Sequence, residues 1–155
     1  RMTVEEIVAT WQPLVEAMPD KKWLFTVSPI RHVKDGLHEN HINKGILLQA
    51  VEQLTKQTGC SYFPAYEIML DELRDYRYYA EDMVHPSFMA VEYIWQRLVE
   101  TYMTADTQAE MKTLHKLWRD EHHRFIHPDS MEAKRFLERL GQKKHELQED
   151  YPWIE

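Results

Sequence analysis

The sequence of 155 residues contains a single cysteine, four glycines and no long apolar run. One cysteine, Cys60, excludes an internal disulfide bond. No stretch approaches the roughly 20 consecutive apolar residues of a membrane-spanning helix, and the first residues do not have the layout of a signal peptide. The sequence therefore predicts no membrane partner. It leaves the cellular compartment open, with the cytoplasm as our default assignment.

Positive charge is also scarce. Lys and Arg together number 19, against 26 Asp and Glu, and the net charge is −7. The basic residues are scattered among acidic ones, so there is no basic stripe of the kind that binds nucleic acid. Apolar residues make up 43% of the chain, which is enough for a compact domain with a buried core. We therefore expect a globular protein without a nucleic-acid partner.

The first half of the chain alternates between helical and strand patterns. Residues Thr3 to Glu6 form a capping box at the start of an amphipathic helix. The short apolar run 23–27 predicts a strand that is covered on both faces. A second amphipathic helix over 39–57, closed by Gly59, leads to another short strand at 61–63. A helix between two strands is a βαβ unit, typical of a parallel sheet in an α/β protein.

The most informative short motif is Asp82-Met83-Val84-His85-Pro86. On an irregular loop, Asp82 can reach one ring nitrogen of His85 and fix its tautomer, which leaves the other nitrogen to take a proton from a nucleophile. Pro86 fits the first position of a helix, where a missing N–H costs nothing. His85 is therefore expected beside the helix N-cap. A capped, solvated loop is the plain structural alternative.

Two other Asp-x-x-His spacings occur in the chain. Asp120 and His123 fall in a helical segment, where residues three apart share a solvated face, and we interpret them as surface residues. Asp35 and His38 lie in the loop after the first predicted strand, where open α/β sheets bind their ligands. Spacing alone leaves this second pair open as an alternative.

The loop after the first predicted strand carries further polar groups. Ser28, Arg31 and His32 supply a hydroxyl, a cation and an imidazole at the carboxyl end of that strand. Each also has an ordinary explanation as a turn residue or a surface side chain. We take all three as candidates for substrate contact.

Four ordered segments of the sequence carry a family resemblance. They are residues 26–32 (TVSPIRH), 62–69 (YFPAYEIM), 71–77 (DELRDYR) and 82–87 (DMVHPS). Together they resemble the C-terminal half of the GSCFA-domain family, which belongs with the SGNH (GDSL-type) hydrolases. The resemblance covers about residues 1–104. It implies part of a three-layer α/β/α sandwich of the SGNH-hydrolase (flavodoxin-like) type.

The same resemblance implies an ester hydrolase, with deacylation of a carbohydrate as one form of the reaction. Asp82 takes the role of the orienting carboxylate and His85 that of the general base. Ser28, Arg31 and His32 match a loop in which relatives hold the substrate or an oxyanion. No cofactor or metal is implied.

The nucleophile is the main departure from the family. The Gly-Ser-Cys-Phe-Ala motif that corresponds to the nucleophile block is absent from the 155 residues, and Cys60 does not lie in that context. The resemblance therefore implies a downstream fragment, inactive by itself, whose nucleophile comes from a preceding segment. A parallel sheet without its first strands exposes hydrogen-bonding edges, so we also expect self-association.

Residues 105–155 predict a helical hairpin that extends the hydrolase half at 1–104. Asp106 is expected to cap the first helix, and Ser130 precedes the second. The apolar stripe of the first helix is Met111, Leu114, Trp118, Phe125 and Ile126. His123 and His127 have a spacing that suits a shared metal ion, but no carboxylate or cysteine completes a ligand set, and we assign no metal site.

Two functions from different classes are the main alternatives at this point, and a metal-binding helical module, testable by the effect of a chelator on the melting temperature, is a third. One is a fragment of an SGNH-type ester hydrolase that acts on a small-molecule or carbohydrate ester. The alternative is a non-catalytic interaction module that binds a partner chain through exposed helices. Hydrolysis of a simple acetyl ester, compared with that of the His85→Ala and Asp82→Ala variants, separates these two interpretations.

Overall fold

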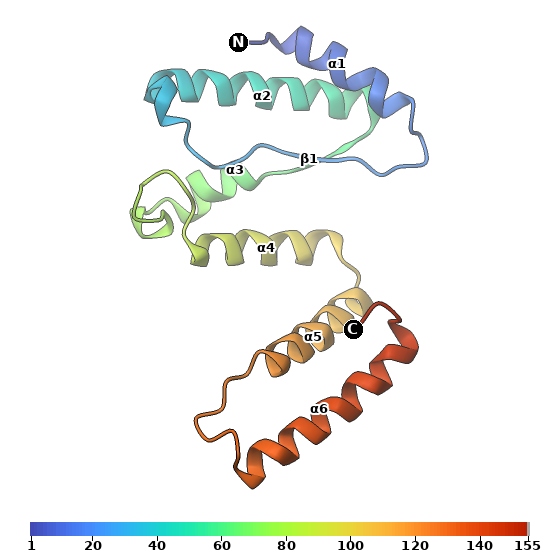
Figure 1. Ribbon diagram of the computed structural model, residues 1–155. Helices are drawn as coiled ribbons and strands as arrows, with labels where there is room; N and C mark the ends of the chain where they lie inside the picture. Colours follow the sequence, from blue (N-terminus) through green and yellow to red (C-terminus); the bar gives the residue numbers. More distant parts are fainter. Residues whose placement is uncertain (155) are drawn as a thin grey trace. The chain divides into compact units, whose positions relative to one another are not determined.

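The computed structural model describes residues 1–154 and shows a helix-rich α/β chain with one small parallel sheet (Figure 1). Two compact units divide it, one of residues 1–101 and one that starts at Tyr102. The elements in chain order are α1 (Val4–Glu16), β1 (Leu24–Thr26), the 3₁₀ helix η1 (Val33–Asp35), α2 (Leu37–Thr58), β2 (Ser61–Phe63), α3 (Ala65–Glu67), the π-helix η2 (Ile68–Leu73), the 3₁₀ helix η3 (Tyr76–Tyr78), α4 (Phe88–Tyr102), α5 (Ala105–Glu121) and α6 (Met131–Asp150).

Helix α1 begins at the predicted capping box. The Thr3 hydroxyl accepts a hydrogen bond from the Glu6 N–H (3.2 Å), and the Glu6 carboxylate accepts one from the Thr3 N–H (2.8 Å). These bonds satisfy N–H groups that have no partner inside the helix. Helix α1 lies along α2 in Figure 1, and Val8 is buried against Ala50 and Leu54 of α2. The predicted amphipathic pairing of the two helices is therefore present.

Strands β1 and β2 pair in parallel, with Phe25 opposite Tyr62, and α2 connects them. The βαβ prediction is confirmed, although β1 is two residues shorter than the apolar run 23–27. Neighbouring side chains on a strand point to opposite faces of a sheet. Phe25 packs on the cluster between α1 and α2, whereas Phe63 packs on Ile94 of α4. Helices α1 and α2 thus cover the face that carries Phe25. On the other face Phe63 is buried but Leu24, Thr26 and Ser61 are exposed, so the prediction of a strand covered on both faces is wrong for β1.

The apolar stripe of α1 is buried only in part. Val8 and Val15 are buried. Trp11 packs edge-on against Phe25, with ring centroids 5.3 Å apart, yet 39% of its surface is exposed. Leu14 is also exposed. One side of α1 therefore contributes to the core, and the other presents large apolar side chains to solvent.

The start of α4 differs from the sequence-based expectation. Pro86 is not at the first helical position, because it pairs with Tyr79 in an isolated antiparallel bridge and α4 begins at Phe88. The Ser87 hydroxyl accepts a hydrogen bond from the N–H of Ala90 (3.3 Å), which is the bond of an N-cap. A serine caps a helix better than the residues before it, so the helix starts two positions later than predicted.

The second unit is the predicted helical hairpin, in which α5 contacts α6. Leu117 of α5 and Ala133 of α6 are buried, and Lys144 forms an ion pair with Glu121 (2.7 Å). As predicted, α6 begins after Ser130, which is its N-cap. None of the helices within residues 1–154 is long and apolar enough to cross a membrane.

Two details of the hairpin correct the prediction. Thr104, not Asp106, caps α5, since its hydroxyl accepts a hydrogen bond from an N–H in the first turn. The helix ends at Glu121, so Phe125 and Ile126 lie in the connection and not on a helical stripe. Phe125 still packs on a phenylalanine of α6, whereas Ile126 is 91% exposed. Apolar spacing therefore extended the predicted helix too far.

The packing predicts which leucine side chain of α2 contributes most to the free energy of unfolding. Leu54 is 1% exposed, and its truncation to alanine leaves a cavity in the α1/α2 core. We expect Leu54→Ala to lower the free energy of unfolding by about 2–5 kcal/mol, measured by urea denaturation. Leu47→Ala is the matched control, because Leu47 lies on the same helix but is 39% exposed. Equal losses from the two variants would contradict this assignment of the core.

Candidate active site

The loop from Tyr79 to Pro86 carries the candidate acid–base pair. The bridge between these two residues closes its base. Inside the loop the Ala80 N–H donates to the His85 carbonyl (2.8 Å), and the Met83 N–H donates to the Ala80 carbonyl (2.9 Å). Met83 has φ of 59°, a left-handed conformation that is uncommon for a residue other than glycine. The loop is therefore held in a defined turn by its own backbone.

The carboxylate of Asp82 accepts three hydrogen bonds. Its Oδ1 accepts from the backbone N–H groups of Val84 (2.9 Å) and His85 (3.0 Å), and its Oδ2 lies 2.6 Å from Nδ1 of His85. Because an ionised carboxylate only accepts, we assign the imidazole proton to Nδ1, which leaves Nε2 as a proton acceptor. The side chains of His85 and Asp82 are 58% and 49% exposed. The pair is therefore accessible from solvent.

The same contacts lower the pKa of Asp82 from its usual 3.8 to about 2. The largest cause is the backbone N–H of His85, followed by the imidazole of His85 and the backbone N–H of Val84. Each of these donors favours the charged form of the carboxyl group. Asp82 is thus a carboxylate throughout the neutral pH range, as a residue that orients a general base must be.

Arg31 connects the loop after β1 to the loop of the pair. Its backbone N–H donates to the Val84 carbonyl (3.2 Å), and its guanidinium Nη1 donates to the Met83 carbonyl (3.2 Å). The guanidinium also lies over the Tyr79 ring, 3.9 Å from the centroid, which is a cation–π contact. Of the three residues predicted to contact substrate, Arg31 is the one that hydrogen-bonds to this loop within residues 1–154.

Ser28 and His32 lie in the same loop as Arg31. The Ser28 hydroxyl accepts a hydrogen bond from the Ile30 N–H (3.2 Å), an ordinary turn contact. The His32 side chain is exposed. Within residues 1–154, neither side chain forms a hydrogen bond with Asp82 or His85. Their contact with substrate stays a prediction.

Sequence reasoning missed two buried polar residues of α2. The Asn40 side-chain oxygen accepts from the His32 N–H (2.9 Å), and the Lys44 ammonium donates to the Ser28 carbonyl (2.6 Å). Asn40 is 5% exposed and Lys44 3%. Burial lowers the pKa of Lys44, because desolvation disfavours the charged ammonium. The signal in the sequence that could have identified them is their spacing, because Asn40 and Lys44 are four positions apart and fall on the side of the helix that also carries apolar residues.

Within the described residues, Asp82 and His85 are the one Asp-x-x-His pair whose side chains touch. The carboxylate of Asp35 contacts an asparagine of α2 instead. Asp120 and His123 are joined by a backbone hydrogen bond at the end of α5. No group of three or more His, Cys, Asp or Glu in residues 1–154 is arranged to hold a metal ion.

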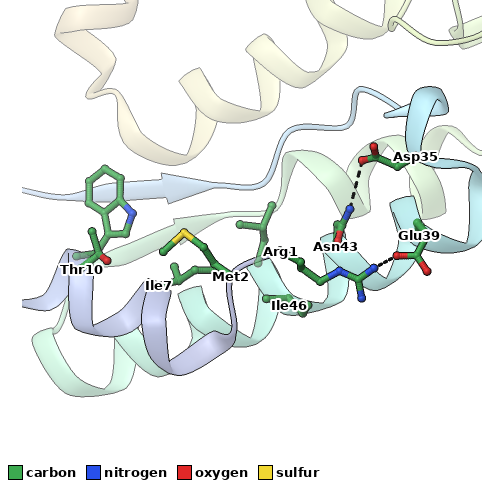
Figure 2. A pocket seen from close by; sticks show the side chains of 10 residues that line it. Arg1, Met2, Ile7, Thr10, Asp35, Glu39, Asn43 and Ile46 are labelled. Carbon is green, nitrogen blue, oxygen red and sulfur yellow. Dashed lines mark hydrogen bonds and ion pairs between the residues drawn. The ribbon is translucent and has the colours of Figure 1, made fainter.

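A separate pocket of about 700 Å³ lies between α1 and α2 (Figure 2). Met2, Ile7 and Ile46 contribute apolar side chains to it, and Arg1 forms an ion pair with Glu39 at its edge. Neither member of the acid–base pair lines this pocket, and its lining contains no histidine, serine or cysteine. The Thr10 hydroxyl in the lining donates to the Glu6 carbonyl, and the Glu39 carboxylate is paired with Arg1. We therefore assign the pocket no catalytic role.

Fold and site together define an α/β chain with a candidate acid–base pair in a loop that contacts the loop after a parallel strand. The model of the GSCFA family matches residues 1–98. The chain belongs to this family, and the predicted membership of the GSCFA family is confirmed. No curated protein and no solved structure matches the chain.

The hydrogen bonds of Asp82 predict how its carboxyl group titrates. We expect a pKa of about 2, measured from its side-chain carbon resonance by NMR. Because this value lies below the usual 3.8, the charged form stabilises the loop above about pH 4, and that stabilisation is lost as the pH falls towards 2. His85→Ala should raise the pKa only in part, since the backbone N–H groups remain. His123→Ala is the control and should leave Asp82 unchanged. Titration near 3.8 in the unsubstituted chain would contradict the three hydrogen bonds.

Proposed function

We propose that this chain is part of an SGNH-type ester hydrolase in which His85 is the general base and Asp82 orients it. The observation that carries the proposal is the 2.6 Å contact between Asp82 Oδ2 and His85 Nδ1 in a solvent-accessible loop. This contact leaves Nε2 available to accept a proton, which is the arrangement of a catalytic triad without its nucleophile.

The reaction follows the chemistry of that arrangement. His85 Nε2 takes the proton of a nucleophile as the nucleophile attacks the ester carbonyl. The imidazolium that forms is stabilised by the Asp82 carboxylate, and it returns the proton to the leaving alcohol. Water then attacks the acyl intermediate in the same way, and an acid is released. Esters of carbohydrates are one substrate class that fits this reaction.

The nucleophile is proposed to come from a segment outside these 155 residues, the one that bears the motif for which the family is named. Neither candidate in the chain suits the role. Cys60 precedes β2, at the opposite end of the strand from the site, and packs on the apolar cluster of Val8, Ala50 and Leu54. The Ser28 hydroxyl accepts a hydrogen bond from the Ile30 N–H, and within residues 1–154 it forms no hydrogen bond with His85. Ser28 and His32 are instead proposed to meet the substrate from the exposed face of their loop.

A larger sheet is part of the same proposal. Two strands alone rarely form an independently stable sheet. Phe25 and Phe63 pack into separate apolar clusters with helices, α1 and α2 in one and α4 in the other, which fits one section of a three-layer α/β/α sandwich. We propose that further strands of the longer protein pair with this sheet.

Hydrolysis of a simple acetyl ester tests the proposed function. The longer protein that contains this chain is expected to turn over, and His85→Ala is expected to reduce kcat by about a thousandfold or more. Asp82→Asn removes the orienting charge and should also cause a large loss. The 155-residue chain alone should be inactive, because it lacks the nucleophile.

Asp120→Asn and His123→Ala are the matched controls for this assay. They remove a pair of identical spacing at the end of α5 and should leave kcat unchanged. If the longer protein fails to hydrolyse a panel of acyl esters, or the His85 variant remains fully active, the hydrolase proposal is wrong. The interaction-module alternative then becomes the better explanation of the exposed helices.

Self-association of the chain is a separate expected outcome. Strand β1 has β2 as its partner in the two-stranded sheet, and Leu24 on β1 is 41% exposed. Trp11, which packs on Phe25 of β1, is 39% exposed. We propose that a second copy of the chain covers the edge of β1 that does not face β2, together with these exposed apolar side chains. Sedimentation velocity should show dimers or larger species at micromolar concentration, and Leu24→Lys should weaken them. Leu137→Lys, on exposed α6, is the control. A stable monomer at that concentration would refute self-association.

A further inference from the structure

Lys44 is buried without an acidic partner. Its side chain is 3% exposed, its Nζ lies 2.6 Å from the Ser28 carbonyl, and it is 5.8 Å from the centroid of the Tyr66 ring. No carboxylate within residues 1–154 forms an ion pair with it. Burial removes the hydration of an ammonium, and one carbonyl and one ring replace only part of it. A methionine would fill similar space without this cost, so the charge requires another explanation.

The contacts of Lys44 explain what the charge does. Lys44 holds the backbone of residue 28, and Asn40, one helical turn earlier, holds the backbone of residue 32. These are the two buried polar residues among residues 1–154, and both bind the same five-residue loop. Helix α2 therefore fixes this loop at both ends through main-chain atoms, independently of the side chains in the loop.

Arg31 lies between the two fixed ends and reaches the loop of the acid–base pair. Its guanidinium binds the carbonyl of Met83 and its N–H binds the carbonyl of Val84. These are the two residues that separate Asp82 from His85 in the sequence. Fixing their carbonyl groups restrains the turn in which the Asp82 carboxylate meets the imidazole. A continuous set of contacts thus runs from α2 to the pair.

We propose that Lys44 is a positioning residue for the Asp82–His85 pair and acts through the backbone of residues 28–32 and the side chain of Arg31. The catalytic meaning of this assignment rests on the proposed function. Its structural content does not, because the geometry of the pair can be observed in the chain without turnover.

NMR spectroscopy of the 155-residue chain tests the assignment. The variants are Lys44→Met, Arg31→Met and the double variant, with Lys56→Met as control, because Lys56 lies on the same helix and is 72% exposed. Two signals report the pair: the pKa of the Asp82 carboxyl group, and the fraction of neutral His85 protonated at Nδ1, from long-range proton–nitrogen spectra. A variant that is merely less stable but still folded changes neither signal.

Both single variants are expected to raise the pKa of Asp82 from about 2 by about half a unit or more, and to lower the Nδ1-protonated fraction. The double variant should match the single variants, since residues that act in series are not additive. Lys56→Met should change nothing. Asn40→Ala releases the other end of the loop and serves as a second variant if Lys44→Met does not fold; it should shift both signals in the same direction.

The proposal is overturned if Lys44→Met, folded by circular dichroism, leaves both signals unchanged. It is equally overturned if Arg31→Met has no effect, or if the two substitutions add, because Lys44 would then act by another route. These results are independent of the ester assay. A longer protein without esterase activity refutes the hydrolase and not the positioning role, whereas unchanged NMR signals with an active enzyme refute the positioning role alone.

Discussion

The candidate site depends on the carboxylate of Asp82, because this group closes a turn and orients an imidazole at the same time. One oxygen binds two backbone N–H groups, and the other binds Nδ1 of His85. Exposed ion pairs usually contribute little, since both side chains lose freedom when they meet. Here the turn already holds the carboxylate in place through main-chain bonds. The pair can therefore be ordered although about half of each side chain faces solvent.

The two halves of helix α2 have different surroundings. The first half contacts the loop next to the candidate site, and the second half packs in the apolar core that stabilises the fold. Its first half starts near the carboxyl end of β1 and buries Asn40 and Lys44 against residues 28–32, the loop that follows β1. Its second half runs towards the start of β2 and buries Ala50 and Leu54 in the apolar core. One rigid helix therefore spans both regions. Precise sites are more easily built on such an element than on loops alone, because the packed core fixes its orientation.

Local signals in the sequence predicted the helices and strands. The residues at which they begin and end depend on which of several neighbouring groups forms the hydrogen bonds there. The capping box at Thr3 and the βαβ pattern needed only residues close in the chain. Pro86 was misplaced because its bridge to Tyr79 depends on the loop closing on itself. Lys44 was missed because a search for apolar periodicity treats buried positions as apolar. The bond from Arg31 to Met83 joins residues 52 apart, and spacing along a chain carries no signal for such a contact.

Under the proposed function, the two-stranded sheet and a nucleophile outside these 155 residues have a common explanation. Phe63 of β2 is 3% exposed beneath α4, whereas Leu24 of β1 is 41% exposed. These two side chains share one face of the sheet, which is therefore buried at Phe63 and open at Leu24. A further parallel strand added beside β1 would end at the same edge as β1, where the loop of Arg31 begins, because parallel strands present their carboxyl ends together. A nucleophile at the carboxyl end of that strand would lie at the same end of the sheet as the loop of Arg31, which contacts the loop of His85.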